Sequence, residues 1–276
     1  MVPSAPPDPP VTPRDAATVV LLRDSSRGPE VYLLRRVTGM AFAGGMTVFP
    51  GGGVDARDSS AGAWAGPDPE WWAEEFSCSP ALARALVCAA VRETFEESGV
   101  LLAGPDAGSV VGDTARYADA RAALVGRVLS LSAFLSDAGL VLRSDLLRPW
   151  ANWITPEAEA RRYDTRFFLA ELPEGQRADG ETTEADHSGW QRPDDALHDW
   201  KAGRSGLLPP TWMTLSELGD HATVRAAMTV PKMFSPVIPK VVRRGDTLSV
   251  VLPGSPEYEA AAGHLDARPG DRLERS

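Results

Sequence analysis

The sequence is poor in cysteine, in long hydrophobic runs and in basic charge, and each shortage excludes a class of protein. Two cysteines, Cys78 and Cys88, exclude a disulfide scaffold and favour a reducing, cytoplasmic setting. No apolar run approaches the roughly 20 residues that a membrane helix needs. Lys and Arg number 28 against 38 Asp and Glu, and the net charge of −10 disfavours binding to nucleic acid or to an anionic membrane.

The first residues, MVPSAPPDPPVTP, lack the basic and apolar blocks of a signal peptide. Their prolines and the scarcity of core-forming residues predict a disordered tail over 1–13. We expect a single domain over 14–256, because strand and helix patterns recur through that range. Residues 257–276 are polar and weakly patterned, which predicts a flexible C-terminal tail.

Short runs of β-branched, aromatic and leucine residues predict strands, the first two of which pair as a hairpin. These runs lie at 17–22, 31–34, 46–49, 164–172 and 248–252. The third run ends at Pro50, and no regular element is expected to contain Pro50 and the three glycines after it. Irregular structure is predicted for residues 56–79.

One helix is predicted together with both of its ends. Ser79 caps it, Pro80 fits its first position, and Gly99 follows its last residue, where a left-handed conformation favours glycine. Further helical patterns lie at 114–138, 193–202 and 214–218. The apolar stripe of the first of these consists of Leu124, Val128, Leu131 and Leu135. Strands and helices mix without a regular βαβ rhythm, which predicts an α+β fold.

Three carboxylates share one face of the helix that begins at Pro80. Glu93, Glu96 and Glu97 stand at i, i+3 and i+4, where like charges repel, and near a helix C-terminus, where the macrodipole disfavours anions. A divalent cation offsets both penalties, and carboxylate oxygens suit the hard ions Mg²⁺ and Mn²⁺. Arg92 would steady a carboxylate by a forked hydrogen bond. The alternative is a solvated acidic helix face.

The flanking residues favour a metal site over a solvated face. The opposite side of the helix is apolar and anchors it, and its members are Val87, Ala90, Val91 and Phe95. A glycine-rich turn precedes the helix in the chain, and glycine lets backbone N–H groups approach a phosphate.

The stretch Arg92-Glu93-Thr94-Phe95-Glu96-Glu97-Ser98-Gly99-Val100 resembles the second half of the Nudix box, R-E-U-x-E-E-x-G-U, in which U is a bulky aliphatic residue. Phe49-Pro50-Gly51-Gly52 resembles the F-P-G-G that opens the same box. With the segment WQRPDDAL at 190–197, the resemblance to the Nudix hydrolase superfamily spans 16–220. It implies a mixed β-sheet sandwiched between α-helices.

The box departs from the family pattern, G-x5-E-x7-R-E, at its first glutamate. Asp58 stands at that spacing after Gly52, and 33 residues instead of seven separate Asp58 from Arg92. We place the insert within the box at 59–79 and a helical insert over 105–150. Either Asp58 replaces the first glutamate of the box, or that residue is absent.

A split box with a Trp-rich insert is similar to the Nudix-19-like subgroup, as are residues 152–156 (NWITP) and 164–168 (DTRFF). That subgroup implies coenzyme A or acyl-CoA as the substrate. The upstream pattern of coenzyme A Nudix enzymes is matched only in part. It agrees at Leu33, Arg36 and Gly45 and departs at Leu34, Val37 and Ala41.

The resemblance also implies a role for each residue of the box. Glu93, Glu96 and Glu97 would hold Mg²⁺ or Mn²⁺, with Glu93 acting as a ligand or as the base. Arg92 would orient these carboxylates rather than touch the substrate.

Three glycines and two further side chains complete the predicted site. The backbone of Gly51, Gly52 and Gly53 would contact the diphosphate of the substrate. Arg36 would reach a substrate phosphate, or it is simply an exposed strand end. Glu184 would act as the general base, or it belongs to a solvated acidic loop.

Together these features predict a diphosphatase that cleaves a nucleoside diphosphate linked to another group, with coenzyme A or acyl-CoA as the expected substrate. ADP-ribose, NADH and dinucleoside polyphosphates are the alternative substrates, and a domain that senses a nucleotide without cleaving it is the alternative function. The expected partner is a small nucleotide, with neither nucleic acid nor a membrane. The helical stretch at 114–138 either supports a homodimer or caps the site.

Overall fold

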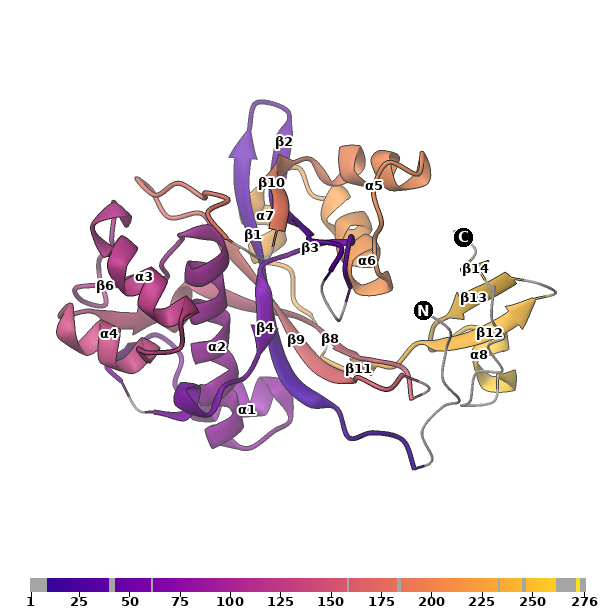
Figure 1. Cartoon of the computed structure of the whole chain (residues 1–276), viewed down its shortest axis with the longest axis horizontal. Coiled ribbons are helices and arrows are strands. Elements are labelled where there is room, and N and C mark those ends of the chain that lie inside the picture. The colour runs from indigo at the N-terminus through magenta and orange to yellow at the C-terminus, as the bar shows by residue number, and fades with distance from the viewer. Residues whose placement is uncertain are drawn as a thin grey trace.

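The computed structural model describes residues 9–39, 43–60, 62–157, 159–182, 185–232, 234–244, 247–261 and 272–273. Its largest sheet contains β1 (Arg14–Ser25), β2 (Gly28–Arg36), β3 (Thr47–Val48), β4 (Gly51–Gly53), β8 (Leu147–Ile154), β9 (Tyr163–Glu171), β10 (Ala185–Gln191) and β11 (Pro236–Val237). The order is β10-β2-β1-β9-β8-β11, with β3 beside β2 and β4 beside β1 (Figure 1). Because β1 pairs antiparallel with β2 and parallel with β9, the sheet is mixed.

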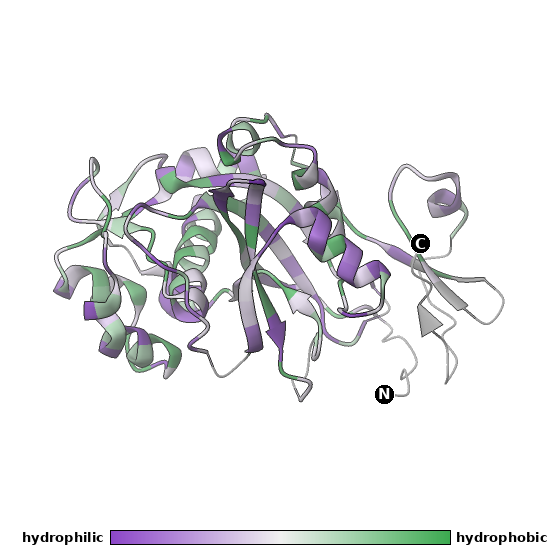
Figure 2. Ribbon diagram, turned by 90° about the horizontal axis from the view of Figure 1, so that it is seen from above, coloured by the Kyte–Doolittle hydropathy of each residue, from purple (hydrophilic) through white to green (hydrophobic). Residues whose placement is uncertain are grey.

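Helices cover both faces of this sheet (Figure 1). On one face lie α1 (Pro69–Phe76) and α2 (Pro80–Ser98), and on the other α5 (Pro193–Lys201), α6 (Pro209–Gly219) and α7 (Val224–Met228). A hydrophobic core lies on each face of the sheet, and successive residues of β1 point into opposite cores. Leu21 belongs to the same core as Leu86 of α2, whereas Leu22 belongs to the same core as Leu215 of α6. Figure 2 shows hydrophobic residues along the central strands and the helices beside them. The predicted α+β fold, with a mixed sheet between helices, is confirmed.

The helix predicted from its end signals has the expected bounds. The Ser79 side chain accepts from the Leu82 N–H, Pro80 is the first residue of α2, and Gly99 ends it with φ of 72°. Local chemistry therefore determines both ends of the element that carries the three predicted carboxylates.

The predicted helical stretch 114–138 is broken into two α-helices, which follow a short 3₁₀ turn (Ala115–Tyr117). These helices are α3 (Ala118–Val125) and α4 (Leu131–Asp137). Leu124, Leu131 and Leu135 are buried, but Val128 is 82% exposed, so it does not belong to the predicted stripe. The chain turns between the helices, where Arg127 has φ of 58°. Beside them lies a small sheet of β5 (Trp64–Ala65), β7 (Val141–Arg143) and β6 (Ala103–Gly104).

Two predictions of irregular structure were wrong. The glycines after Pro50 form β4, which pairs with β1 as Thr18↔Gly51, Ala17↔Gly52 and Ala16↔Gly53. Residues 56–79 contain a 3₁₀ turn (Ala56–Ser59), β5 and α1. Asp68 begins α1 by accepting the Trp71 N–H at 2.8 Å, a capping signal that the prediction overlooked.

After β11, the last strand of the main sheet, the chain forms four more elements. They are β12 (Lys240–Arg244), β13 (Thr247–Val251), α8 (Pro256–Ala260) and β14 (Arg272–Leu273). Earlier in the chain, a 3₁₀ turn (Ser144–Leu146) precedes β8. Part of α8 and all of β14 lie within the predicted C-terminal tail. Residues 9–13, the described part of the predicted N-terminal tail, contain no helix or strand. No helix among the described residues is long and apolar enough to cross a membrane.

Candidate active site

The three predicted carboxylates lie in the last two turns of α2 and are mostly buried. The side chains of Glu93 and Glu96 are each 13% exposed, and Glu97 is 7% exposed. Arg92 joins two of them: its Nη1 lies 2.7 Å from Oε1 of Glu93 and 3.3 Å from Oε2 of Glu96. The acidic face of α2 is therefore not a solvated one, and it is neutralised in part by the arginine of the same motif.

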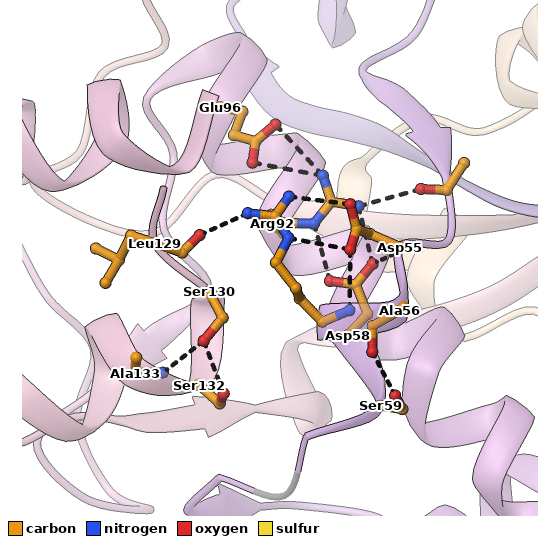
Figure 3. Close-up of polar contacts among 12 residues, drawn as sticks. Asp55, Ala56, Asp58, Ser59, Arg92, Glu96, Leu129, Ser130, Ser132 and Ala133 are labelled. Carbon is orange, nitrogen blue, oxygen red and sulfur yellow. Dashed lines mark hydrogen bonds and ion pairs between the residues drawn. The ribbon is translucent and has the colours of Figure 1, made fainter. Parts of the chain in front are cut away.

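Asp58 holds the other side of the Arg92 guanidinium (Figure 3). Arg92 Nε donates to Oδ1 of Asp58 at 2.8 Å, and Nη2 donates to Oδ2 at 2.9 Å and to the Gly53 carbonyl at 3.1 Å. The Asp58 side chain has no exposed surface. Its Oδ2 also accepts the Asp55 N–H at 2.8 Å, which closes a capping box around the 3₁₀ turn.

The insert within the box therefore does not separate its two halves in space. Asp58 follows Gly52 at the spacing of the first acid of the box and meets Arg92 in a bidentate ion pair, although 33 residues lie between them in the chain. Of the two predicted alternatives, the geometry favours Asp58 in the place of the first glutamate.

The glycine strand β4 packs directly on the carboxylates. The N–H of Gly51 donates to Oε2 of Glu97 at 2.8 Å. A Cβ on Gly52 would lie 2.5 Å from Oε1 of Glu93, and a Cβ on Gly51 would lie 2.5 Å from the Ala17 carbonyl oxygen. Real Cβ atoms do not approach so closely, so both glycines are needed for the contact between β4, β1 and α2.

Burial changes the proton affinity of this cluster. Desolvation raises the pKa of Glu93 to about 7, against the lowering effect of Arg92. Desolvation also raises the pKa of Glu96, again opposed by Arg92. The pKa of Arg92 is raised because Asp58 and the glutamates stabilise its cationic form more than burial penalises it. Two carboxylates are therefore undercompensated, and a further cation beside them would favour their charged forms.

The donor chemistry of the cluster fits a divalent cation. Carboxylate oxygens are the ligands that Mg²⁺ and Mn²⁺ prefer, and desolvation by burial raises the pKa values of Glu93 and Glu96. Among the described residues, no three side chains of His, Cys, Asp or Glu converge closely enough to surround an ion. Glu93 and Glu96 instead face Arg92, and Glu97 faces Gly51. Binding an ion requires rotation of these side chains toward one point.

The predicted roles of Arg36 and Glu184 stay predictions. Arg36 ends β2, where its backbone donates to the Met46 carbonyl at 3.0 Å and pairs with Ala185. Glu184 lies outside the described residues, so its prediction stays untested.

Other residues that contact the cluster were not predicted. Arg57 binds Asp55 through Nε at 3.0 Å and the Leu129 carbonyl through Nη1 at 2.8 Å, which joins the 3₁₀ turn to the α3–α4 connection. Arg121 of α3 donates from Nε to the Glu96 carbonyl at 3.0 Å and binds Asp179. No local motif identifies these contacts, because Leu129 is far from Arg57 in the chain and both Glu96 and Asp179 are far from Arg121.

Comparison with known proteins identifies the family and the fold. The family model described as the NUDT19 Nudix domain matches residues 74–218. The crystal structure of a NUDIX hydrolase from Alicyclobacillus acidocaldarius is 30% identical in sequence, with a TM-score of 0.70, and the match covers 81% of this chain and 98% of that one. The expected Nudix fold is thereby confirmed.

Curated relatives are more distant in sequence. Putative nudix hydrolase 7 of Caenorhabditis elegans is 27% identical over 83% of this chain and 68% of its own length. Acyl-coenzyme A diphosphatase NUDT19 of Xenopus laevis is 26% identical over 71% of this chain and 61% of its own length, and the human protein of that name is 28% identical over 76% and 70%. The chain thus spans about two thirds of the length of these relatives.

Proposed function

The chain belongs to the Nudix hydrolases with a NUDT19-type domain, and we propose that it hydrolyses the diphosphate bond of coenzyme A or an acyl-CoA with the help of Mg²⁺ or Mn²⁺. Water adds to one phosphorus and the bridging oxygen leaves with the other phosphate, which yields 3′,5′-ADP and phosphopantetheine or its acyl derivative. The names of the Xenopus and human relatives and the split box support this substrate class.

The observation that carries the proposal is the contact of the glycine strand with the carboxylates of α2. Gly51 donates its N–H to Glu97, and Gly52 leaves no room for a side chain against Glu93. A diphosphate that approaches β4 would therefore arrive beside the carboxylates. A buried acidic face with a purely structural role would not need a strand without side chains against it.

Each side chain of the site has a task in the proposed reaction. Glu96 and Glu97 would hold the divalent cation, which neutralises the charge of the diphosphate and activates water. Glu93 would act as a second ligand or as the base. Arg92, fixed by Asp58, would keep Glu93 and Glu96 oriented.

Two further residues belong to the proposal because the sequence resemblance implies their roles. Arg36 would bind a substrate phosphate, and Glu184 would be a second candidate for the general base. Glu93 is favoured as the base over Glu184, because its contacts with Arg92 and Gly52 place it in the cluster.

A panel of substrates tests the proposal. Purified protein would be incubated with CoA, an acyl-CoA, ADP-ribose, NADH and a dinucleoside polyphosphate, each with Mg²⁺ or Mn²⁺, and the products identified by mass spectrometry. We expect 3′,5′-ADP and phosphopantetheine from CoA. Release of AMP and ribose 5-phosphate from ADP-ribose, with CoA left intact, would contradict the substrate class. Binding of a nucleotide without turnover of any substrate would establish the sensor alternative.

A further inference from the structure

The end of α2 carries charges that oppose its own macrodipole. Its last two turns hold Glu93, Glu96 and Glu97, and its last turn has no basic residue. A helix C-terminus favours cations, and its final carbonyls need donors from elsewhere. Both requirements have to be met by residues outside α2.

Arg121 of α3 meets both requirements. Its side chain is 11% exposed, and its Nε donates to the Glu96 carbonyl at 3.0 Å. Its Nη1 binds both carboxylate oxygens of Asp179, at 2.7 and 2.9 Å. The N–H of Asp179 then donates to the Ser98 carbonyl at 2.9 Å. The helical insert and the loop after β9 thus provide donors for two carbonyls in the last turn of α2.

Asp179 is also tied to the main sheet, because the Tyr32 hydroxyl of β2 donates to its carbonyl. Gly99, which ends α2, fits against this junction. A Cβ there would lie 2.6 Å from Oδ2 of Asp179 and 3.0 Å from Nη1 of Arg121. The glycine of the box is therefore required by its φ of 72° and also by the ion pair beside it.

Stability alone does not explain a cation at this position. Removing a guanidinium from water is costly, and Nη2 of Arg121 is buried with no hydrogen-bond partner among the described residues. Its partner Asp179 is 42% exposed, and ion pairs open to solvent contribute little net free energy of folding. What the pair does provide is a fixed geometry for the peptide of Glu96 and for Ser98.

We infer that Arg121 is a positioning residue for the site: with Asp179 it fixes the backbone of the last turn of α2, from which the side chains of Glu96 and Glu97 reach a divalent cation. The inference rests on the proposed function for the presence of the cation. It means that the helical insert, through Arg121, supports the site of its own chain. Arg121 itself touches neither the cation nor the substrate.

The test compares Arg121→Met and Asp179→Asn with a matched control, Arg143→Met. Arg143 is 8% exposed and binds Asp145 at 2.8 and 2.7 Å, but its guanidinium contacts lie outside α2. Mn²⁺ affinity is measured from the EPR signal of the free ion, and hydrogen exchange of residues 94–99 is measured in metal-free protein. Values of kcat and KM are then measured with the substrate that the wild type cleaves.

We expect Arg121→Met to weaken Mn²⁺ binding about tenfold, to speed exchange in residues 94–99 and to lower kcat more than KM rises. Asp179→Asn, which keeps the side-chain shape, should change all three in the same direction, and it serves if Arg121→Met does not fold. Arg143→Met should leave Mn²⁺ affinity within twofold. Unchanged exchange and affinity in both Arg121→Met and Asp179→Asn would overturn the inference, as would equal effects of Arg143→Met.

Failure of the proposed function gives a different result. A wild-type protein that binds no Mn²⁺ and cleaves no substrate contradicts the proposed function. The exchange measurement still tests whether Arg121 fixes the end of α2, and loss of that effect contradicts the positioning role by itself.

Discussion

At Gly52 a hydrogen atom occupies the place of a Cβ, and the Glu93 carboxyl oxygen Oε1 lies 2.5 Å from that place. Gly52→Ala must therefore displace either β4 or the Glu93 side chain. A shift of about 1 Å in a catalytic group costs on the order of 100-fold in rate. We expect a loss of that size in kcat/KM, measured with the substrate that the wild type cleaves.

A second glycine of the same sheet supplies the control. Gly189 in β10 has no atom within 4 Å of its Cβ position, so Gly189→Ala should alter kcat/KM less than twofold. Equal activities of Gly52→Ala and wild type would show that the close contact between β4 and the Glu93 side chain does not affect the reaction.

Glu93 also gives the metal-free protein a pH dependence. Its folded pKa of about 7 exceeds the ordinary 4.5, so the folded state holds this proton more tightly than the unfolded state. The resulting stabilisation is fully present below pH 4.5 and is lost as the pH rises through 7. One such proton changes the free energy of unfolding by at most about 1.4 kcal/mol per pH unit.

Urea unfolding in EDTA between pH 5 and 8 measures this slope. Wild type should lose stability as the pH rises, and Glu93→Gln should show a flatter profile. Some slope should persist in the variant, because the pKa of Glu96 is also raised. Asp55 and Asp145 have lowered pKa values and titrate below this range. A wild-type profile that is flat or rises with pH would contradict the assignment.

At the scale of elements, α2 was predictable because its signals are local. Ser79, Pro80 and Gly99 act through the backbone within a few residues, and the i, i+3, i+4 spacing places the carboxylates on one face. The first hairpin was predictable for a similar reason, since alternation and a tight turn are properties of neighbouring residues.

Contacts between distant segments were not predictable in the same way. The glycines of β4 form a strand only because β1 lies beside them, and Asp58 meets Arg92 only after the insert folds away. Arg121 belongs to a helix with no visible link to the box. The sequence resemblance identified the carboxylates, whereas the contacts by which the inserts support them are visible only in the structure.

Val128 and Leu131 both belong to the predicted apolar stripe of the insert, but only Leu131 is buried in the structure. Val128 is 82% exposed and Leu131 only 2%. Leu131→Ala should lower the free energy of unfolding by about 2–5 kcal/mol, because it leaves a cavity against α2 and its neighbours. Val128→Ala should change it by less than about 0.5 kcal/mol. Urea unfolding of both variants checks the difference, and equal losses would mean that 114–138 packs as one continuous stripe.

At the scale of the whole molecule, the two faces of the sheet have different tasks. The face of α1 and α2 carries the carboxylates, the glycine strand and the helical insert, whereas α5, α6 and α7 close the opposite core (Figure 1). The helical insert bonds the Glu96 carbonyl through Arg121, and its Leu129 carbonyl bonds Arg57 beside the 3₁₀ turn of Asp58, so this insert supports the site from two sides.

The most direct test of the account is turnover of CoA by wild type and Glu97→Gln, with the metal removed by chelation and then restored. Glu74→Gln in α1 is the control, because Glu74 is an exposed acid outside the cluster. We predict release of 3′,5′-ADP by wild type and by Glu74→Gln only after Mg²⁺ or Mn²⁺ is restored, and a loss of at least about 100-fold in Glu97→Gln. Release of 3′,5′-ADP at wild-type rates by Glu97→Gln, or by chelated wild type, would contradict it.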